Sequence, residues 1–325
     1  MPAIITHYTF ARDVSENAGV TGFEQAFYLG AQGPDPFFFF GQLNKRENKK
    51  DIQHYGARLH HMDFSEVYSE LLAYASKSEH KDLLSSYIKG LFAHYAMDRN
   101  CHPYIFYRSG VGKDKEKKPF EAAHACLETY IDIILGKRKG TFTRHMERYL
   151  DVPEEQLQII SKMWYDVNKK TLDHPSLKED SFSISNKDYQ KTLSFLNNPR
   201  WFKKILVTLI QGKASQAYAL IYPKHFEGER EDLDYLNDKK EVWREPSTKK
   251  ERKESFEQLY QKSAKDFYSI LPTLEKGLEG EDVLKDIVSY VDDIDHDGKK
   301  NGSEVICFSS IWPSYPGTSV KDFEK

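Results

Sequence analysis

The amino-acid sequence predicts an all-α fold, a multi-helix bundle, from three observations. Aromatic side chains are abundant, with 20 Tyr and 20 Phe in 325 residues, whereas the Val, Ile and Thr alternation typical of strands is scarce. Apolar residues recur at helical spacing in several stretches. No internal repeat or low-complexity linker divides them. We expect a single α-helical domain over residues 1–325, with the chemistry in residues 1–140 and a helical C-terminal half in residues 141–325.

The charge balance argues against two classes of partner. The formal net charge is −3, which gives no electrostatic footprint for nucleic acid or for an anionic membrane. No transmembrane stretch and no apolar signal region stand out, so we expect a cytoplasmic protein. Cys101, Cys126 and Cys307 show no disulfide or zinc-finger spacing, which agrees with a reducing environment.

The first part of the chain combines a short helix with a heavily punctuated segment. Residues 22–29 favour a helix that Thr21 can cap. Residues 30–36 contain two glycines and two prolines and are predicted to form an irregular loop. Asp35 lies between the two prolines and is expected to be held rigidly. The four phenylalanines at residues 37–40 are expected to anchor this loop in the core.

The next predicted helix, from Asp51 to about Ser76, carries three histidines. Asp51 can cap its first turn. His54, His60 and His61 follow along it. Adjacent side chains on a helix point about 100° apart, so at most one of His60 and His61 is expected to face a common site.

A central helix is predicted from about residue 81 to Cys101. His94 and Asp98 are four residues apart on its apolar stripe, where a core helix normally carries Leu or Val. A buried carboxylate is costly unless it is paired or bound to metal. His102 follows, and Pro103 is expected to end the helix. The alternative interpretation is a buried His–Asp pair with a histidine facing the helix dipole.

A second histidine–acid pair occurs on the following helix. Pro119 is predicted to open that helix at its favoured first position. His124 and Glu128 are again four residues apart on the core side. Two such pairs on consecutive helices are harder to explain by packing than one, so this repetition favours metal binding.

The remainder of the chain is helical with little chemistry. A charged segment at residues 227–251 is predicted to be a long exposed loop. His145, His174 and His225 have no helical partner and are expected to be solvated. Further helices are predicted at residues 153–169, 187–196, 199–221, 248–278 and 281–291.

One C-terminal stretch matches the spacing of a calcium-binding loop. Its acidic positions are Asp293, Asp295, Asp297 and Glu304. Lys300 occupies a position where an apolar residue is expected, and the segment after the loop looks extended rather than helical. A polar turn without calcium is the alternative.

The candidate donors together indicate a multi-metal site between helices. Imidazole and carboxylate without thiolate suit zinc, although iron or manganese would also fit. This many donors suit two or three ions, and clustered ions are a recurring solution for cleaving phosphoesters. The donors are His7, Asp35, His60 or His61, His94, Asp98, His102, His124 and Glu128.

The order of these residues resembles the bacterial zinc-dependent phospholipases C and their relatives, the fungal single-strand-specific nucleases. The resemblance covers about residues 1–135 and implies a helical fold of that type with three zinc ions. Its motifs here are His7, Gly30-x-x-Gly33-Pro34-Asp35, His60, His94-x3-Asp98-x3-His102 and His124-x3-Glu128.

The resemblance also implies a role for each donor. One ion would be bound by His94, Asp98, His60 and Asp35, and Asp35 would also be the candidate general base. Asp98 would bridge to a second ion held by His7 and by the N-terminal amine. The third ion would be bound by His102, His124 and Glu128.

Three features depart from the family pattern. The interval between Asp35 and His60 is longer, which leaves His54 and His61 as alternatives. The family's N-terminal Trp is missing, and so is an export signal. The sequence therefore predicts a zinc-dependent phosphodiester hydrolase of phospholipase C type, with phospholipid as one candidate substrate. The alternatives are a nuclease or small-phosphoester hydrolase with the same metals, or a non-catalytic, metal-stabilised binding protein.

Overall fold

The computed structural model describes residues 4–111, 117–197 and 233–309, and this part of the chain is mostly helical. The predicted all-α class is confirmed. One small sheet is present among these residues, in which β1 (Trp243–Arg244) pairs antiparallel with β2 (Glu251–Arg252). The helices are α1 (Ile4–Val14), α2 (Glu24–Gly30), η1 (Asp35–Phe39), α3 (Lys49–His61), α4 (Ser65–Ala75), α5 (Lys81–Ser109), α6 (Lys117–Lys139), η3 (Met146–Leu150), α7 (Glu154–Lys170), α8 (Ser181–Asn197), α11 (Phe256–Leu278) and α12 (Leu284–Val291).

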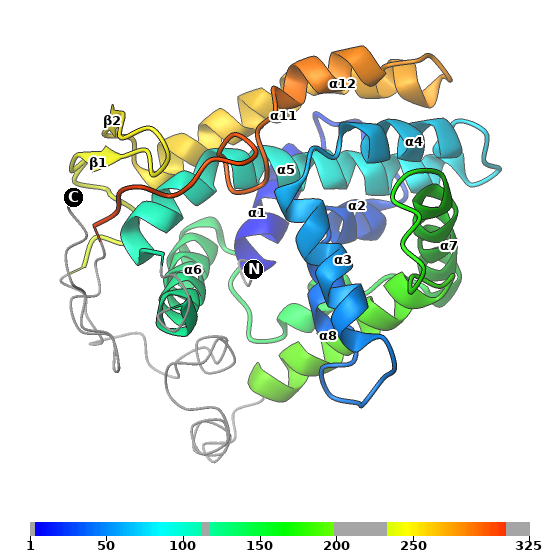
Figure 1. Cartoon of the computed structure of the whole chain (residues 1–325), viewed down its shortest axis with the longest axis horizontal. Coiled ribbons are helices and arrows are strands. Elements are labelled where there is room, and N and C mark those ends of the chain that lie inside the picture. The colour runs from blue at the N-terminus through cyan, green and yellow to red at the C-terminus, as the bar shows by residue number, and fades with distance from the viewer. Residues whose placement is uncertain (1–3, 112–116, 198–232, 310–325) are drawn as a thin grey trace.

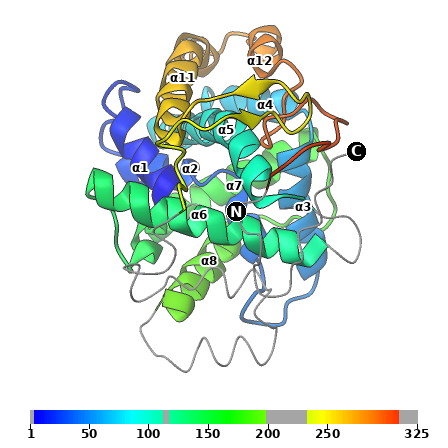
Figure 2. The same ribbon diagram turned by 90° about the vertical axis from the view of Figure 1, so that its left-hand side faces the viewer.

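Helix α5 is the central element of the bundle. It is buried along most of its length and packs against α1, α2, α4, α6 and α11. Figure 1 shows α11 running along α5 at the top of the view, with α1 and α2 below α5. In Figure 2, α6 crosses beneath α1 and α5, both of which it contacts. None of the helices in the described ranges is long and apolar enough to span a membrane.

Two glycines let α2 and α5 cross with their backbones in contact. A Cβ on Gly30 would lie 2.1 Å from the carbonyl oxygen of Tyr87, and one on Gly90 would lie 2.3 Å from that of Phe27. Larger residues would therefore force the helices apart. This close crossing brings the turn after α2 over α5. There Gly33, with φ of +59°, lies so near His94 that a Cβ would sit 2.2 Å from the imidazole ring.

The prediction that Pro103 ends the central helix is wrong. Helix α5 continues through Pro103 to Ser109. Proline costs a helix one hydrogen bond, because it has no N–H to donate to the carbonyl of Arg99 four residues earlier. Burial of α5 among several elements outweighs this local penalty. As a result His102 remains on the helix, one turn after Asp98.

Other boundaries also differ from the predicted ones. Residues 4–14 form a helix that the sequence pattern did not reveal, and the helix predicted at residues 51–76 is two helices, α3 and α4, because Met62 is extended (φ −116°, ψ 164°). Asp35 begins a short 3-10 helix rather than lying in an irregular loop. The helix predicted from residue 248 begins at Phe256, where Ser255 and Gln258 form a capping box. Helix α8 extends beyond the predicted residues 187–196, and α12 begins three residues after its predicted start. The described residues include neither the helix predicted at residues 199–221 nor His225.

Candidate metal centre

Asp98 is the hub of a group of buried histidines. Its carboxylate oxygens lie 3.2 Å from His7 Nε2, 3.0 Å from His94 Nε2 and 3.7 Å from His102 Nε2. His7 comes from α1, and the other three residues share one face of α5 at four-residue spacing. All four are buried. One carboxylate therefore faces three imidazoles from two helices.

A second group lies where η1 meets α3. Asp35 Oδ1 is 2.9 Å from His60 Nε2, and Asp35 is only 3% exposed. The Nδ1–H of His60 donates to the carbonyl of Gly56 at 2.9 Å, and that of His94 donates to the carbonyl of Ala31 at 3.1 Å. These backbone bonds fix both rings so that Nε2 faces the carboxylates.

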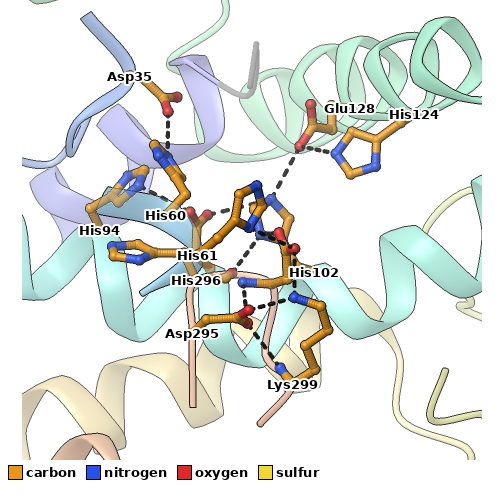
Figure 3. Close-up of polar contacts among 12 residues, drawn as sticks. Asp35, His60, His61, His94, His102, His124, Glu128, Asp295, His296 and Lys299 are labelled. Carbon is orange, nitrogen blue, oxygen red and sulfur yellow. Dashed lines mark hydrogen bonds and ion pairs between the residues drawn. The ribbon is translucent and has the colours of Figure 1, made fainter. Parts of the chain in front are cut away.

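A third group joins α5 to α6. Glu128 Oε1 lies 3.2 Å from His124 Nε2 and 3.5 Å from His102 Nε2. Figure 3 shows His102 between this pair and the side of the site that holds Asp35, His60 and His94. The three groups therefore form one continuous site whose donors come from α1, η1, α3, α5 and α6.

The donor arrangement fits divalent cations. The donor atoms lie within 4.8 Å of one another in each of three groups: His7, His94 and Asp98; Asp35, His60 and His94; and His102, His124 and Glu128. Within the described residues, His7 Nδ1 has no hydrogen-bond partner, and His94 Nε2 lies near Asp98 without hydrogen-bond geometry. Buried imidazole nitrogens are normally hydrogen-bonded, so two such nitrogens without a hydrogen-bond partner favour a metal.

The buried carboxylates and imidazoles of this site shift one another's pKa values. Burial alone would raise the pKa of Asp98, but His102, His94 and His7 outweigh it and hold that pKa well below its usual range. Burial would likewise lower the pKa of His102, yet Asp98 and Glu128 raise it to about 10. Because metal ligands must be deprotonated, a zinc ion would compete directly with this proton.

Only one of the three histidines on α3 belongs to these three donor groups. His60 is buried against Asp35, whereas His54 is exposed. The His61 side chain is 57% exposed, and its Nδ1 lies 3.3 Å from Asp297 Oδ2. The structure therefore places His60 with the other candidate ligands, and it separates His61 and His54 from Asp35.

This separation leads to a prediction for the neighbouring pair. We expect His60→Ala to lose bound zinc, because it removes a buried donor beside Asp35. We expect His61→Ala to keep the wild-type zinc content, because its exposed ring faces Asp297 rather than Asp35. Metal analysis of the two purified variants checks this. Equal zinc loss in both variants would contradict the assignment of His60.

The predicted calcium loop folds as a tight turn with an internal cation. The Lys299 ammonium contacts the carboxylates of Asp295 and Asp297, the latter at 3.1 Å. Asp293 instead accepts a hydrogen bond of 2.8 Å from Asn301, and Glu304 is exposed. Lysine thus supplies positive charge at the place where the sequence pattern predicted calcium.

Three residues near the site were not predicted to take part in it. Asp132 accepts hydrogen bonds from the backbone N–H groups of Ile5 (3.1 Å) and Thr6 (2.7 Å), so it caps α1 and fixes the helix that carries His7. Its position four residues after Glu128 was a usable signal. His296 and Asp297 also lie at the site, and the only signal for them was a His-Asp dipeptide within the predicted calcium loop.

His145 and His174 lie outside the three candidate donor groups. His145 is exposed and pairs with Glu147 at 3.2 Å. His174 is half-buried, with its ring 5.6 Å from that of Tyr55. The N-terminal amine that the resemblance implied as a ligand belongs to residues 1–3, which lie outside the described ranges.

A comparison with protein families gave one match. The family model described as zinc dependent phospholipase C matches residues 6–204. The matched region contains every predicted donor from His7 to Glu128, and it ends before the turn that carries His296. Comparisons with curated proteins and with solved structures gave no match.

Proposed function

Because the chain belongs to the zinc-dependent phospholipase C family, we propose that it hydrolyses phosphodiesters at the site between its helices. The observation that carries the proposal is the sharing of donors between neighbouring groups. Asp98 faces His7, His94 and His102, and His94 also belongs to the group of Asp35. Shared donors favour ions held a few ångströms apart, which is the arrangement that suits phosphoester cleavage.

The proposed ligand sets follow the three groups. His60, His94, Asp98 and Asp35 would hold one zinc ion, and Asp98 would bridge to a second ion at His7. Bound zinc would polarise the phosphate and lower the pKa of water. The third ion would be held by His102, His124 and Glu128.

Asp35 is the proposed general base in this reaction. Its carboxylate would accept the proton of the water that attacks phosphorus. His60 orients it through the 2.9 Å contact, and the carbonyl of Gly56 fixes His60 in turn. Phe38 packs its ring 5.1 Å from that of His60, and Asp35 and His60 are both buried.

The test compares three substrates with and without a chelator. The substrates are a chromogenic phosphodiester, a phosphocholine ester and a single-stranded oligonucleotide. We expect hydrolysis of the first two, loss of turnover with chelator and recovery with zinc. Hydrolysis of the oligonucleotide alone would favour a nuclease. A rise in melting temperature with zinc, without turnover of any substrate, would contradict the enzyme and favour a metal-stabilised binding protein.

A further inference from the structure

A C-terminal loop, residues 293–301, lies against the candidate metal centre although it is far outside the family-matched region 6–204. The backbone N–H of His296 donates to the carbonyl of His60 at 3.2 Å, at the end of α3. The hydroxyl of Tyr95 on α5 donates to the carbonyl of Ile294 at 2.7 Å. Figure 3 shows His296 and its neighbours in the loop beside the candidate ligands.

The loop makes its shortest contact with a candidate ligand at His102. The Nδ1–H of His102 donates to the carbonyl oxygen of His296 at 2.7 Å. This bond fixes the tautomer and leaves Nε2 to face Glu128 at 3.5 Å and Asp98 at 3.7 Å. Metal-binding histidines are typically held by such a bond on the other ring nitrogen, and its loss typically weakens metal affinity about 10- to 100-fold.

Gly298 allows the loop to approach α5 this closely. A Cβ at this position would lie 2.4 Å from the carbonyl oxygen of Arg99 and 2.6 Å from Cγ of Pro103. Pro103 has no N–H, so it leaves the carbonyl of Arg99 without its usual helical hydrogen bond. The loop thus packs onto the part of α5 that the proline alters, next to His102.

The side chain of His296 packs against two further candidate ligands, His60 and His94. It is fully buried, and its ring lies 5.0 Å from that of His60 and 5.5 Å from that of His94. Phe64 and Tyr95 flank it at 4.7 and 5.2 Å. The loop therefore packs against candidate ligands of two different groups at once.

We propose that the C-terminal loop is a positioning element of the metal centre, and that it sets the zinc affinity of the group formed by His102, His124 and Glu128. The inference rests on the proposed zinc ligands. It adds that residues outside the family-matched region determine how tightly one ion is held. The acting group is a backbone carbonyl, that of His296, so the loop's placement matters more than its side chains.

Gly298→Ala and Gly302→Ala form a matched pair for testing this proposal. Both glycines have positive φ, +72° and +77°, so alanine imposes similar backbone strain on each. A Cβ at Gly302 would meet nothing within 4 Å, whereas one at Gly298 would strike α5. Zinc equivalents and their dissociation constants are measured on the full chain by competition with a chromophoric chelator. Melting temperature is measured in parallel.

We expect Gly298→Ala to weaken the binding of one zinc ion about 10- to 100-fold, while Gly302→Ala binds all zinc as the wild type does. Adding Gly298→Ala to His124→Ala should cause no further zinc loss, because both changes act on the same ion. If Gly298→Ala does not fold, Tyr95→Phe replaces it, since it removes only the hydroxyl that holds Ile294.

The outcomes separate this inference from the proposed function. Zinc binding by the wild type with unchanged affinity in Gly298→Ala, or in Tyr95→Phe where Gly298→Ala does not fold, would overturn the role of the loop and leave the proposed function standing. Equal weakening in Gly298→Ala and Gly302→Ala would also overturn it, because backbone strain would then be the cause. A wild-type protein that binds no zinc would overturn both proposals.

Discussion

Asp98→Asn is expected to remove more than one equivalent of zinc and to lower the melting temperature more than any other single change in the site. The carboxylate faces His7, His94 and His102, and it is 4% exposed. The amide keeps the shape but loses the charge that two ions would share. A ligand at about 1,000 times its Kd adds about 4 kcal/mol to the free energy of unfolding, so losing bound zinc costs stability directly.

Asp188→Asn is the matched control for this change. Asp188 is also a fully buried carboxylate, but it accepts a hydrogen bond from the backbone of Gly41 at 2.8 Å, and it is outside the candidate donor groups. The Asp188→Asn protein should have a lower melting temperature than the wild type and the same zinc content. Metal analysis and thermal unfolding of both variants make the comparison. An Asp98→Asn protein with full zinc content and the wild-type melting temperature would refute the bridging role.

Asp35→Asn is expected to reduce turnover by about 10²- to 10⁴-fold, the range typical of a lost general base. His60, His94 and Asp98 would still hold the same ion, so most of the zinc should remain. The rate falls because the amide cannot accept the proton of the attacking water. Turnover of a chromogenic phosphodiester is measured at saturating substrate, together with the zinc content.

Asp51→Asn provides the control for this second change. Asp51 is exposed in the first turn of α3. Its carboxylate accepts a hydrogen bond of 3.1 Å from the hydroxyl of Ser176. It should leave both turnover and zinc unchanged. Near wild-type turnover in Asp35→Asn would exclude Asp35 as the general base. A loss of zinc in proportion to the loss of rate would show that Asp35 acts as a zinc ligand and not as the base.

The histidine–acid pairs could be predicted because their geometry is local. Four-residue spacing places His94 beside Asp98 and His124 beside Glu128 on any regular helix. The structure gives both contacts, at 3.0 and 3.2 Å. The pattern of apolar residues around each pair was enough to predict the helices that carry them, and that part of the fold is confirmed.

The features that could not be predicted depend on contacts between distant segments. Helix α1 begins where Asp132 of α6 supplies its cap, and no sequence window around His7 contains that residue. Helix α5 passes through Pro103 because tertiary packing outweighs a local rule. The contact between His102 and the carbonyl of His296 joins segments that no spacing rule connects.

The spread of the candidate donors over α1, η1, α3, α5 and α6 has a consequence for the order of folding. No single helix holds a complete group, so the ends of several long chain segments must come together before zinc is held tightly, and closing long loops is slow. We therefore expect zinc to enter late and to act mainly on the unfolding rate. Stopped-flow unfolding with excess chelator should be faster than unfolding of the zinc-loaded chain, while refolding rates stay similar. Each ion would then bind to helices that have already come together. Zinc would therefore slow unfolding of the native structure, and it would not direct the folding of the chain.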